Sequence, residues 1–298
     1  MWRGCRGPRP MSDRAHAGTG MSLARCFAGC RAERRAALIP FLTCGYPDGP
    51  QSLELLRGMA DAGADIIELG IPFSDPLADG PTIQRSSFRA LEGGMTTEGT
   101  LEVLRAFRAG HDTPVVLFGY LNPILRYGVD EFARAAVEAG AQGLLLTDVP
   151  AGSDPALEER LAAHGLDLIR LIAPTSSPER IAVIARAGAG FLYYISRTGI
   201  TGARAQLRRA LGREVEAVKQ RSRGIPVVVG FGISTPEQAA DVAAVADGVV
   251  VGSALIDRCE RDGAEGVQEF VATLRGAMGR DGRDLRRIAS LRIQPPDC

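Results

Sequence analysis

Lysine is almost absent from this chain of 298 residues, in which Lys219 is the single lysine among 35 basic residues. Enzymes that form a Schiff base with their substrate, or that bind pyridoxal phosphate, need a lysine in the active site. Lys219 lies in the polar, helix-patterned stretch 212–221, so we expect it to be solvated at the surface. The scarcity of lysine therefore argues against Schiff-base and pyridoxal phosphate chemistry in this chain.

Histidine is also scarce, and the cysteines show no ordered spacing. His16, His111 and His164 are the three histidines, and none of them ends a strand-like run, which disfavours a histidine base and a metal site. The six cysteines include no Cys-x-x-Cys pair, which is typical of reduced thiols in the cytoplasm. Cys26 and Cys30 are close enough in sequence to approach a metal, although such cysteines more often serve as small apolar residues. Proton transfer must therefore fall mainly to carboxylates.

The charges show no excess of either sign. Lys and Arg together number 35, as do Asp and Glu, and the basic residues are scattered. A nucleic-acid-binding surface would need a basic patch, and a membrane span would need about 20 consecutive apolar residues, which no run approaches. We therefore expect neither partner, and a cytoplasmic protein. With 45% hydrophobic residues, the chain allows one large α/β barrel or two smaller domains.

Both ends of the chain differ in composition from the middle. Residues 1–20 are rich in Arg, Gly and Pro and have no periodic pattern, so we predict a disordered extension. They are either a weak transit segment or the result of a start upstream of Met21, and the low serine content favours the second. Residues 280–298 are predicted to be a polar tail. The folded domain is thus expected over residues 21–279.

Between residues 38 and 279 the chain repeats a short apolar run, a loop with Gly, Pro or Asp, and an amphipathic helix. We predict strands over Leu38–Thr43, Asp65–Leu69, Val115–Gly119, Gly143–Thr147, Asp167–Ile172, Phe191–Ile195, Pro226–Val229 and Gly248–Val251. We predict helices over Gln51–Ala62, Thr82–Glu92, Asp130–Ala139, Asp154–His164, Pro178–Ala187, Gln206–Arg221, Thr235–Val245 and Gly263–Gly279, and an extra helix over Thr97–Arg108. Eight βα units in about 240 residues favour a single α/β domain, a (β/α)8 TIM barrel, over an open doubly wound sheet.

A glutamate, Glu68, interrupts the second apolar run. Burial of an ionised carboxyl group costs several kcal/mol unless the group is paired or neutralised, so this position needs a reason. An ion pair with a neighbouring arginine could explain a buried Glu68 without any catalytic role. Alternation along the strand places Ile66 and Glu68 on one face, and Ile67 and Leu69 on the other. If Glu68 points into the barrel, burial should raise its pKa, as an acid–base catalyst requires near neutral pH.

Four loops that follow predicted strands carry further candidates. Asp79 is either a functional carboxylate or a cap of the next helix. Gly230–Ser234 and Gly252–Ser253 combine glycines, serine and a helix start, which suits a phosphate group at the usual phosphate position of the barrel. Residues 196–204 have glycines around Ile200-Thr201 and are either a mobile lid or a plain surface turn.

Residues 68–81, Glu-Leu-Gly-Ile-Pro-Phe-Ser-Asp-Pro-Leu-Ala-Asp-Gly-Pro, resemble the signature of the tryptophan synthase alpha chain family. The resemblance runs from about Met21 to Val271. It includes Pro-Phe-Leu-Thr at 40–43, Gly-Tyr-Leu-Asn-Pro at 119–123, Thr-Asp-Val-Pro at 147–150, Ser-Arg-Thr-Gly-Ile-Thr-Gly at 196–202 and Gly-Phe-Gly-Ile-Ser at 230–234. In one departure, Cys44-Gly45-Tyr46 stands where Ala-Gly-Asp is frequent, near the rim, where it could alter lid or partner contacts.

The resemblance implies reversible retro-aldol cleavage of indole-3-glycerol phosphate to indole and glyceraldehyde 3-phosphate, in L-tryptophan biosynthesis. It implies no cofactor in this chain, and an α2β2 heterotetramer whose beta chain carries pyridoxal phosphate and joins indole to serine. Glu68 matches the catalytic acid–base, Asp79 the aspartate that holds the indole N–H, and Tyr193 the tyrosine beside the glutamate. The resemblance further implies a phosphate cradle of Gly202, Gly232, Gly252 and Ser253, a lid threonine at Thr201, and an indole pocket with Phe41, Phe118, Tyr120 and Phe231.

Three alternatives stay open at this point. Barrels of the indole-glycerol phosphate synthase or phosphoribosylanthranilate isomerase type would share the phosphate loops, but the synthase type needs lysines at strand ends. A barrel that only activates a beta chain is a second alternative, which the presence of Glu68 and Asp79 argues against. A free-standing lyase without a beta chain is the third.

Overall fold

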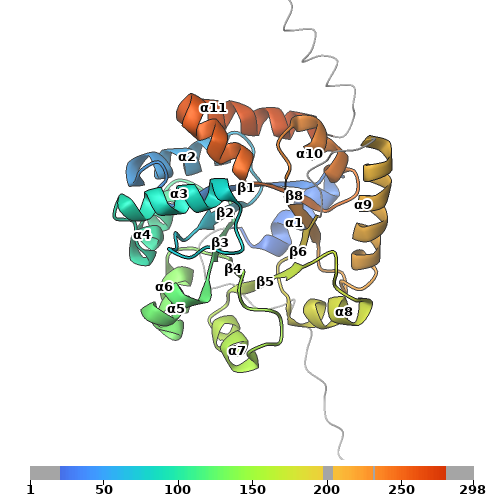
Figure 1. The fold of residues 1–298 in the computed structure, drawn as a ribbon, viewed down its shortest axis with the longest axis horizontal. Coiled ribbons are helices and arrows are strands. Elements are labelled where there is room, and N and C mark those ends of the chain that lie inside the picture. The colour runs from blue at the N-terminus through green and yellow to red at the C-terminus, as the bar shows by residue number, and fades with distance from the viewer. Residues whose placement is uncertain (1–20, 197–203, 231, 280–298) are drawn as a thin grey trace, which may run out of the picture.

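Eight strands pair in chain order, all in parallel, and close into a barrel (Figure 1). They are β1 (Ala37–Thr43), β2 (Ile67–Gly70), β3 (Val115–Gly119), β4 (Gly143–Leu146), β5 (Asp167–Ile172), β6 (Leu192–Ile195), β7 (Val227–Gly230) and β8 (Gly248–Val251). The structure is a computed structural model that describes residues 21–196, 204–230 and 232–279. The predicted TIM barrel is confirmed, whereas the predictions for residues 1–20 and 280–298 fall outside the described residues.

The helices of the described residues mostly surround the barrel (Figure 1). They are α1 (Leu23–Ala32), α2 (Gly49–Asp61), α3 (Pro81–Glu92), α4 (Thr97–Arg108), α5 (Leu121–Tyr127), α6 (Val129–Glu138), α7 (Pro155–Ala163), α8 (Pro178–Ala187), α9 (Arg204–Lys219), α10 (Pro236–Ala243) and α11 (Ser253–Ala277). The extra helix after α3 is confirmed as α4. No helix in this part of the chain is both long and apolar enough to cross a membrane.

Three helical segments were not among the predicted helices. In α1 two of the four inward positions are cysteines, which weakens the apolar pattern. In α5 a proline, Pro123, lies in the first turn, where a helix tolerates it because the N–H groups there have no partner within the helix. The third segment is residues 253–262, the first part of α11. The last helix was predicted to start at Gly263, which is wrong, because this residue has φ 66° and separates two helices within α11.

The side chains of each strand alternate between two apolar layers. Ile66 belongs to a cluster inside the barrel, together with Ile39 and Val116, whereas Ile67 and Leu69 pack in the outer layer against the helices. The predicted alternation along the second strand is therefore confirmed. Each fully buried side chain of this size stabilises the fold by about 2 kcal/mol, before the loss of chain entropy is counted.

Helix α1 closes the N-terminal end of the barrel. The side chains of Leu23, Cys26, Phe27 and Cys30, spaced three or four residues apart, join the inner cluster. The ring of Phe27 lies 5.8 Å from that of Phe191. In Figure 1, α1 is seen behind the centre of the barrel, within the circle of strands. The barrel interior is therefore sealed at this end and accessible from the other.

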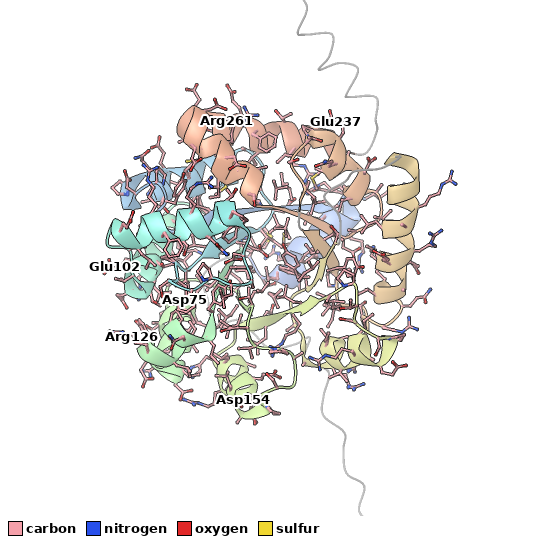
Figure 2. All side chains as sticks on the ribbon, in the orientation of Figure 1. Asp75, Glu102, Arg126, Asp154, Glu237 and Arg261 are labelled. Carbon is pink, nitrogen blue, oxygen red and sulfur yellow. The ribbon has the colours of Figure 1, made fainter. Side chains whose placement is uncertain are left out.

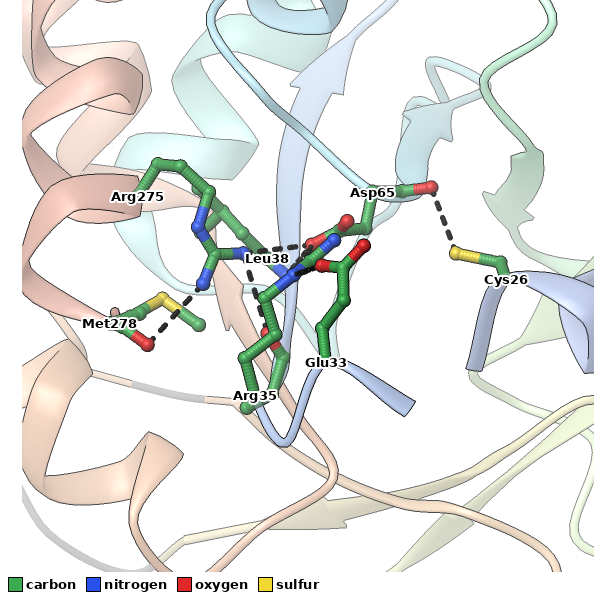
Figure 3. A network of polar contacts seen from close by, with 8 residues as sticks. Cys26, Glu33, Arg35, Leu38, Asp65, Arg275 and Met278 are labelled. Carbon is green, nitrogen blue, oxygen red and sulfur yellow. Dashed lines mark hydrogen bonds and ion pairs between the residues drawn. The ribbon is translucent and has the colours of Figure 1, made fainter. Parts of the chain in front are cut away.

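A carboxylate network at the closed end joins the segment after α1, strand β1, the loop before β2 and helix α11 (Figure 3). One carboxyl oxygen of Asp65 accepts hydrogen bonds from Arg35 at 2.7 Å, from the backbone N–H of Leu38 at 2.8 Å and from Arg275 at 2.9 Å. The Asp65 side chain is only 11% exposed. Because both arginines converge on one largely buried acid, the network fixes the ends of segments that are distant in sequence.

The outer faces of the helices carry charged side chains, such as Glu102, Arg126 and Asp154 (Figure 2). Lys219 differs from the expectation of a fully solvated residue, since its ammonium group pairs with Asp247 at 3.1 Å and is partly buried. It ends α9, next to the start of β7, and so lies at the closed end of the barrel.

We expect Asp65→Asn to lower the free energy of unfolding by about 2–3 kcal/mol, because Arg35 and Arg275 lose their shared counterion in a largely buried site. Urea unfolding followed by circular dichroism measures the change. The control is Glu102→Gln on the exposed face of α4, which should change the value by less than about 0.5 kcal/mol. Equal values for the two variants would show that the network adds no stability.

Candidate active site

A cavity of about 630 Å³ opens at the C-terminal ends of the strands, where a TIM barrel places its active site. Eight of the predicted site residues line it: Phe41, Glu68, Asp79, Phe118, Tyr193, Gly232, Gly252 and Ser253. Three others, Thr201, Gly202 and Phe231, lie outside the described residues, as does most of the predicted lid. The fold thus brings together residues that the sequence scatters over six βα units.

The carboxyl group of Glu68 is buried at the bottom of this cavity. Glu68 sits on β2 between Phe41 of β1 and Val116 of β3, and is 1% exposed. Its Oε1 atom has no hydrogen-bond partner among the described residues, and no arginine there pairs with it. Burial alone raises the pKa of Glu68 to about 8, which confirms the expected direction. The carboxyl group is therefore largely protonated at neutral pH and able to donate a proton.

A second carboxyl group, that of Asp79, reaches the cavity from the loop between β2 and α3. It accepts a hydrogen bond from the Tyr120 hydroxyl at 3.0 Å, and that hydroxyl accepts one from the backbone N–H of Ala78 at 3.1 Å. Burial raises the pKa of Asp79 to about 6, while the bond from Tyr120 acts in the opposite direction. The N-cap of α3 is Gly80, without a side-chain hydrogen bond, so Asp79 does not act as the cap.

Aromatic rings form an apolar wall beside the two carboxyl groups. Phe41 and Phe118 pack edge to face at 5.3 Å, a favourable arrangement for two rings. A side chain at Gly70 would come within 2.8 Å of the Phe41 ring, so the ring can lie there only because this residue is glycine. Tyr120 lies next to the main cavity, in a smaller one that shares Phe41, Asp79 and Phe118. The wall suits a flat apolar group.

Tyr193 lines the cavity from β6, on the same inward face as Glu68. Its hydroxyl would lie 2.0 Å from a side chain at Gly230, the last residue of β7, so only glycine leaves room for the phenol. Burial, together with the negative charge of Glu68 and Asp79 when ionised, raises the pKa of Tyr193 well above its usual value. The phenol is therefore neutral and keeps its proton.

The opposite side of the cavity offers backbone N–H groups. Ser253 begins a short helix, residues 253–262, directly after β8, and Gly252 is its N-cap without a side-chain bond. The first N–H groups of a helix have no partner within it and attract anions. Gly232, in the loop after β7, has φ 74°, a conformation that favours glycine. This arrangement is the one by which TIM barrels bind phosphate.

The short helix is held in place by side chains from the loop after β1 and from α3. The Tyr46 hydroxyl donates to Glu260 at 2.7 Å, and Arg85 of α3 donates to the same carboxylate at 3.2 Å. Thr82 of α3 donates to Asp257 at 3.4 Å. Tyr46 thus contacts the short helix after β8, at the position where Cys44-Gly45-Tyr46 departs from the usual family wording.

Other cavity-lining residues were missed. Leu171 and Ile195 share the inward face of β5 and β6, which alternation along those strands could have identified. Asp257, Arg258 and Arg261 come from the short helix, whose start at Gly252-Ser253 was expected but whose later residues were not predicted as helical. Over the described ranges, no three His, Cys, Asp or Glu side chains gather closely enough to hold a metal ion.

Comparison with known proteins gives a consistent result. A family model described as "Tryptophan synthase alpha chain" matches residues 27–279. The tryptophan synthase alpha chain of Caulobacter vibrioides is 48% identical over 237 residues, 79% of this chain and 86% of that protein. The same protein of Geobacter sulfurreducens is 48% identical over 261 residues, 86% of this chain and 98% of that protein.

Solved structures agree as well. A crystal structure of tryptophan synthase from M. tuberculosis has a TM-score of 0.79 and 38% identity, and covers 88% of this chain and 100% of that one. The alpha subunit from Legionella pneumophila has the same TM-score and identity, with 87% and 99% covered. The chain therefore belongs to the tryptophan synthase alpha chain family, which cleaves indole-3-glycerol phosphate in a lyase reaction and works with a beta chain that carries pyridoxal phosphate.

Proposed function

We propose that Glu68 and Asp79 carry out the lyase reaction of this chain, the retro-aldol cleavage of indole-3-glycerol phosphate to indole and glyceraldehyde 3-phosphate. The observation that carries the proposal is the carboxyl group of Glu68, which is buried in the cavity without a partner for Oε1. A fold that leaves such a group unpaired loses stability, and catalytic acids are groups whose pKa is displaced in this way.

The reaction needs two proton transfers, and one carboxyl group can make both. Protonated Glu68 donates its proton to the indole carbon that bears the glycerol chain, which breaks the aromaticity of the five-membered ring and leaves positive charge on its nitrogen. Asp79, as the carboxylate, accepts the indole N–H and stabilises this charge. The Glu68 carboxylate then takes the proton of the adjacent glycerol hydroxyl, the carbon–carbon bond breaks, and the electron pair restores the indole ring.

The remaining site residues bind the two ends of the substrate. Phe41, Phe118 and Tyr193 provide the apolar wall for indole, with Tyr120 acting through its hydrogen bond to Asp79. The phosphate group is assigned to the N–H groups around Gly232, Gly252, Ser253 and Gly202. Phe231 and the lid threonine Thr201 complete the assignment, on the family resemblance alone.

We further assign the chain to the cytoplasm, to an α2β2 heterotetramer and to catalysis without a cofactor of its own. Cys26, Cys30, Cys44 and Cys259 are free thiols, in keeping with a reducing compartment. Leu77 is 89% exposed and Leu125 is 54% exposed, on segments that follow β2 and β3 at the open end of the barrel. Exposed apolar side chains of this kind support a partner surface there. Lys219 lies at the opposite end and is remote from the chemistry.

Glu68→Gln should lower kcat for indole formation at least 100-fold, with a small change in KM, because an amide fills the same space but cannot transfer the proton. An assay of indole released from indole-3-glycerol phosphate measures both constants. Lys219→Ala is the control and should match the parent. If Glu68→Gln turned over as fast as the parent, the acid–base role would be wrong.

The stability of the chain should depend on pH through Glu68. In the folded state its pKa is about 8, against an ordinary value of 4.5, so unfolding releases a proton between these pH values. The free energy of unfolding should therefore fall as the pH rises from 5 to 8, by on the order of 3 kcal/mol more in the parent than in Glu68→Gln. Urea unfolding of both proteins over this range measures the difference, and parallel curves would contradict the raised pKa.

The complex with a beta chain is tested by native mass spectrometry of co-expressed chains, for which we expect two copies of each. Leu77→Asp should lower the affinity of the two chains at least tenfold, because a charged side chain then replaces an exposed apolar one at the interface. Ala272→Asp, on the exposed face of α11, is the matched control and should leave affinity unchanged. If no beta chain forms a complex with the alpha chain or changes its lyase rate, the result would support the free-standing lyase instead.

A further inference from the structure

Two thiols lie one helical turn apart on α1, at the closed end of the barrel and away from the catalytic cavity. Cys26 is 6% exposed and Cys30 is 3% exposed. The Cys26 thiol donates to the backbone carbonyl of Asp65 at 3.2 Å, as Figure 3 shows. Cys30 instead lines a second cavity, so only the Cys30 thiol of the two is placed to contact a ligand bound there.

This second cavity has a volume of about 200 Å³ and lies between α1, the start of β1 and the C-terminal end of α10. Its lining includes Cys30 and three arginines, Arg31, Arg34 and Arg35, with Asp247 as the single acid. A pocket with this charge attracts an anion, and its volume admits one arm of a small molecule but no protein segment of any length.

Some of the charged side chains that line this cavity already form hydrogen bonds or ion pairs, and others do not. Arg35 bonds to Asp65 and to Glu33, and Asp247 is engaged by Lys219 and by the backbone N–H of Val227. Across the described ranges, by contrast, no ion pair is formed by Arg31 or Arg34. Two guanidinium groups at the rim are therefore available to a ligand.

The electrostatic surroundings of Cys30 favour its thiolate. The neighbouring Cys26 thiol and the charge of Arg35 lower the pKa of Cys30, and they outweigh burial and the interactions with Asp65, which raise it. The pKa values of the three other described cysteines, Cys26, Cys44 and Cys259, are all raised. The thiolate is the nucleophile in thiol–disulfide exchange, and Cys30 is the one described cysteine that lines this cavity, so Cys30 is the thiol placed to react with a ligand bound there.

We propose that Cys30 is a thiol-modification site, and that the arginines of its cavity select small disulfides that carry carboxylates. In the reaction the Cys30 thiolate attacks one sulfur of the disulfide, a bond forms between the two sulfurs, and the original sulfur–sulfur bond breaks. The other half of the disulfide leaves as a thiolate and takes up the proton that Cys30 lost. The incoming disulfide is the oxidant, so no further reagent is needed. This site is independent of the lyase reaction proposed above.

The test uses the full chain with glutathione disulfide as the anionic probe and cystamine as the cationic one, and locates the adducts by peptide mass spectrometry. With glutathione disulfide, Cys30 should react at least tenfold faster than Cys259, although Cys259 is the more exposed at 8%. The double variant Arg31→Gln with Arg34→Gln should slow this reaction about tenfold and leave the reaction with cystamine unchanged or faster.

The control for the arginines is Arg126→Gln with Arg134→Gln, two exposed arginines on α5 and α6, which should not change either rate. Circular dichroism verifies that each variant is folded. The proposal is overturned if Cys259 or Cys44 reacts before Cys30, or if removal of the cavity arginines slows both probes equally. Lyase activity of the parent should stay unchanged after modification of Cys30, which separates this site from the catalytic one.

Discussion

A single desolvated carboxyl group sets the conditions that the rest of the structure must meet. Glu68 is kept from water by the aromatic wall beside it and by strands on both sides, and its Oε1 has no partner within the described residues. An unpaired polar group costs stability, which the apolar layers on both faces of the sheet must offset. The same desolvation that costs stability gives the group its proton at neutral pH.

The two ends of the barrel have different roles: the closed end stabilises the fold, and the open end holds the catalytic groups. At the closed end, α1 seals the interior, and Asp65 pairs with two arginines and fixes them to the strands. At the open end, groups stay unpaired or weakly held, and glycines replace side chains where Phe41 and Tyr193 must fit. This division is general in TIM barrels, whose C-terminal face carries function and whose N-terminal face carries stability.

Local signals explain which parts could be predicted from the sequence. The strands are apolar runs and Glu68 is a charge within one of them, so both are visible residue by residue, and Asp79 and the phosphate loops follow from their place after strands. Contacts between distant segments are not visible in this way. The bond from Tyr46 to Glu260 joins positions 214 residues apart, and α1 was missed because cysteines occupy two of its four inward positions. A helix start was expected at Gly252-Ser253, but residues 253–262 were not among the predicted helices, because Gly263 was predicted to start the last helix, whereas it ends this one.

The position of Lys219 has a practical consequence. Apart from the α-amino group, it carries the only primary amine of the chain, and it lies at the closed end, partly exposed beside Asp247. Coupling through this amine to a solid support would therefore present every molecule in one orientation, with the mouth of the catalytic cavity turned toward the solution. A fluorophore attached there would likewise report on the chain without obstructing entry of the substrate.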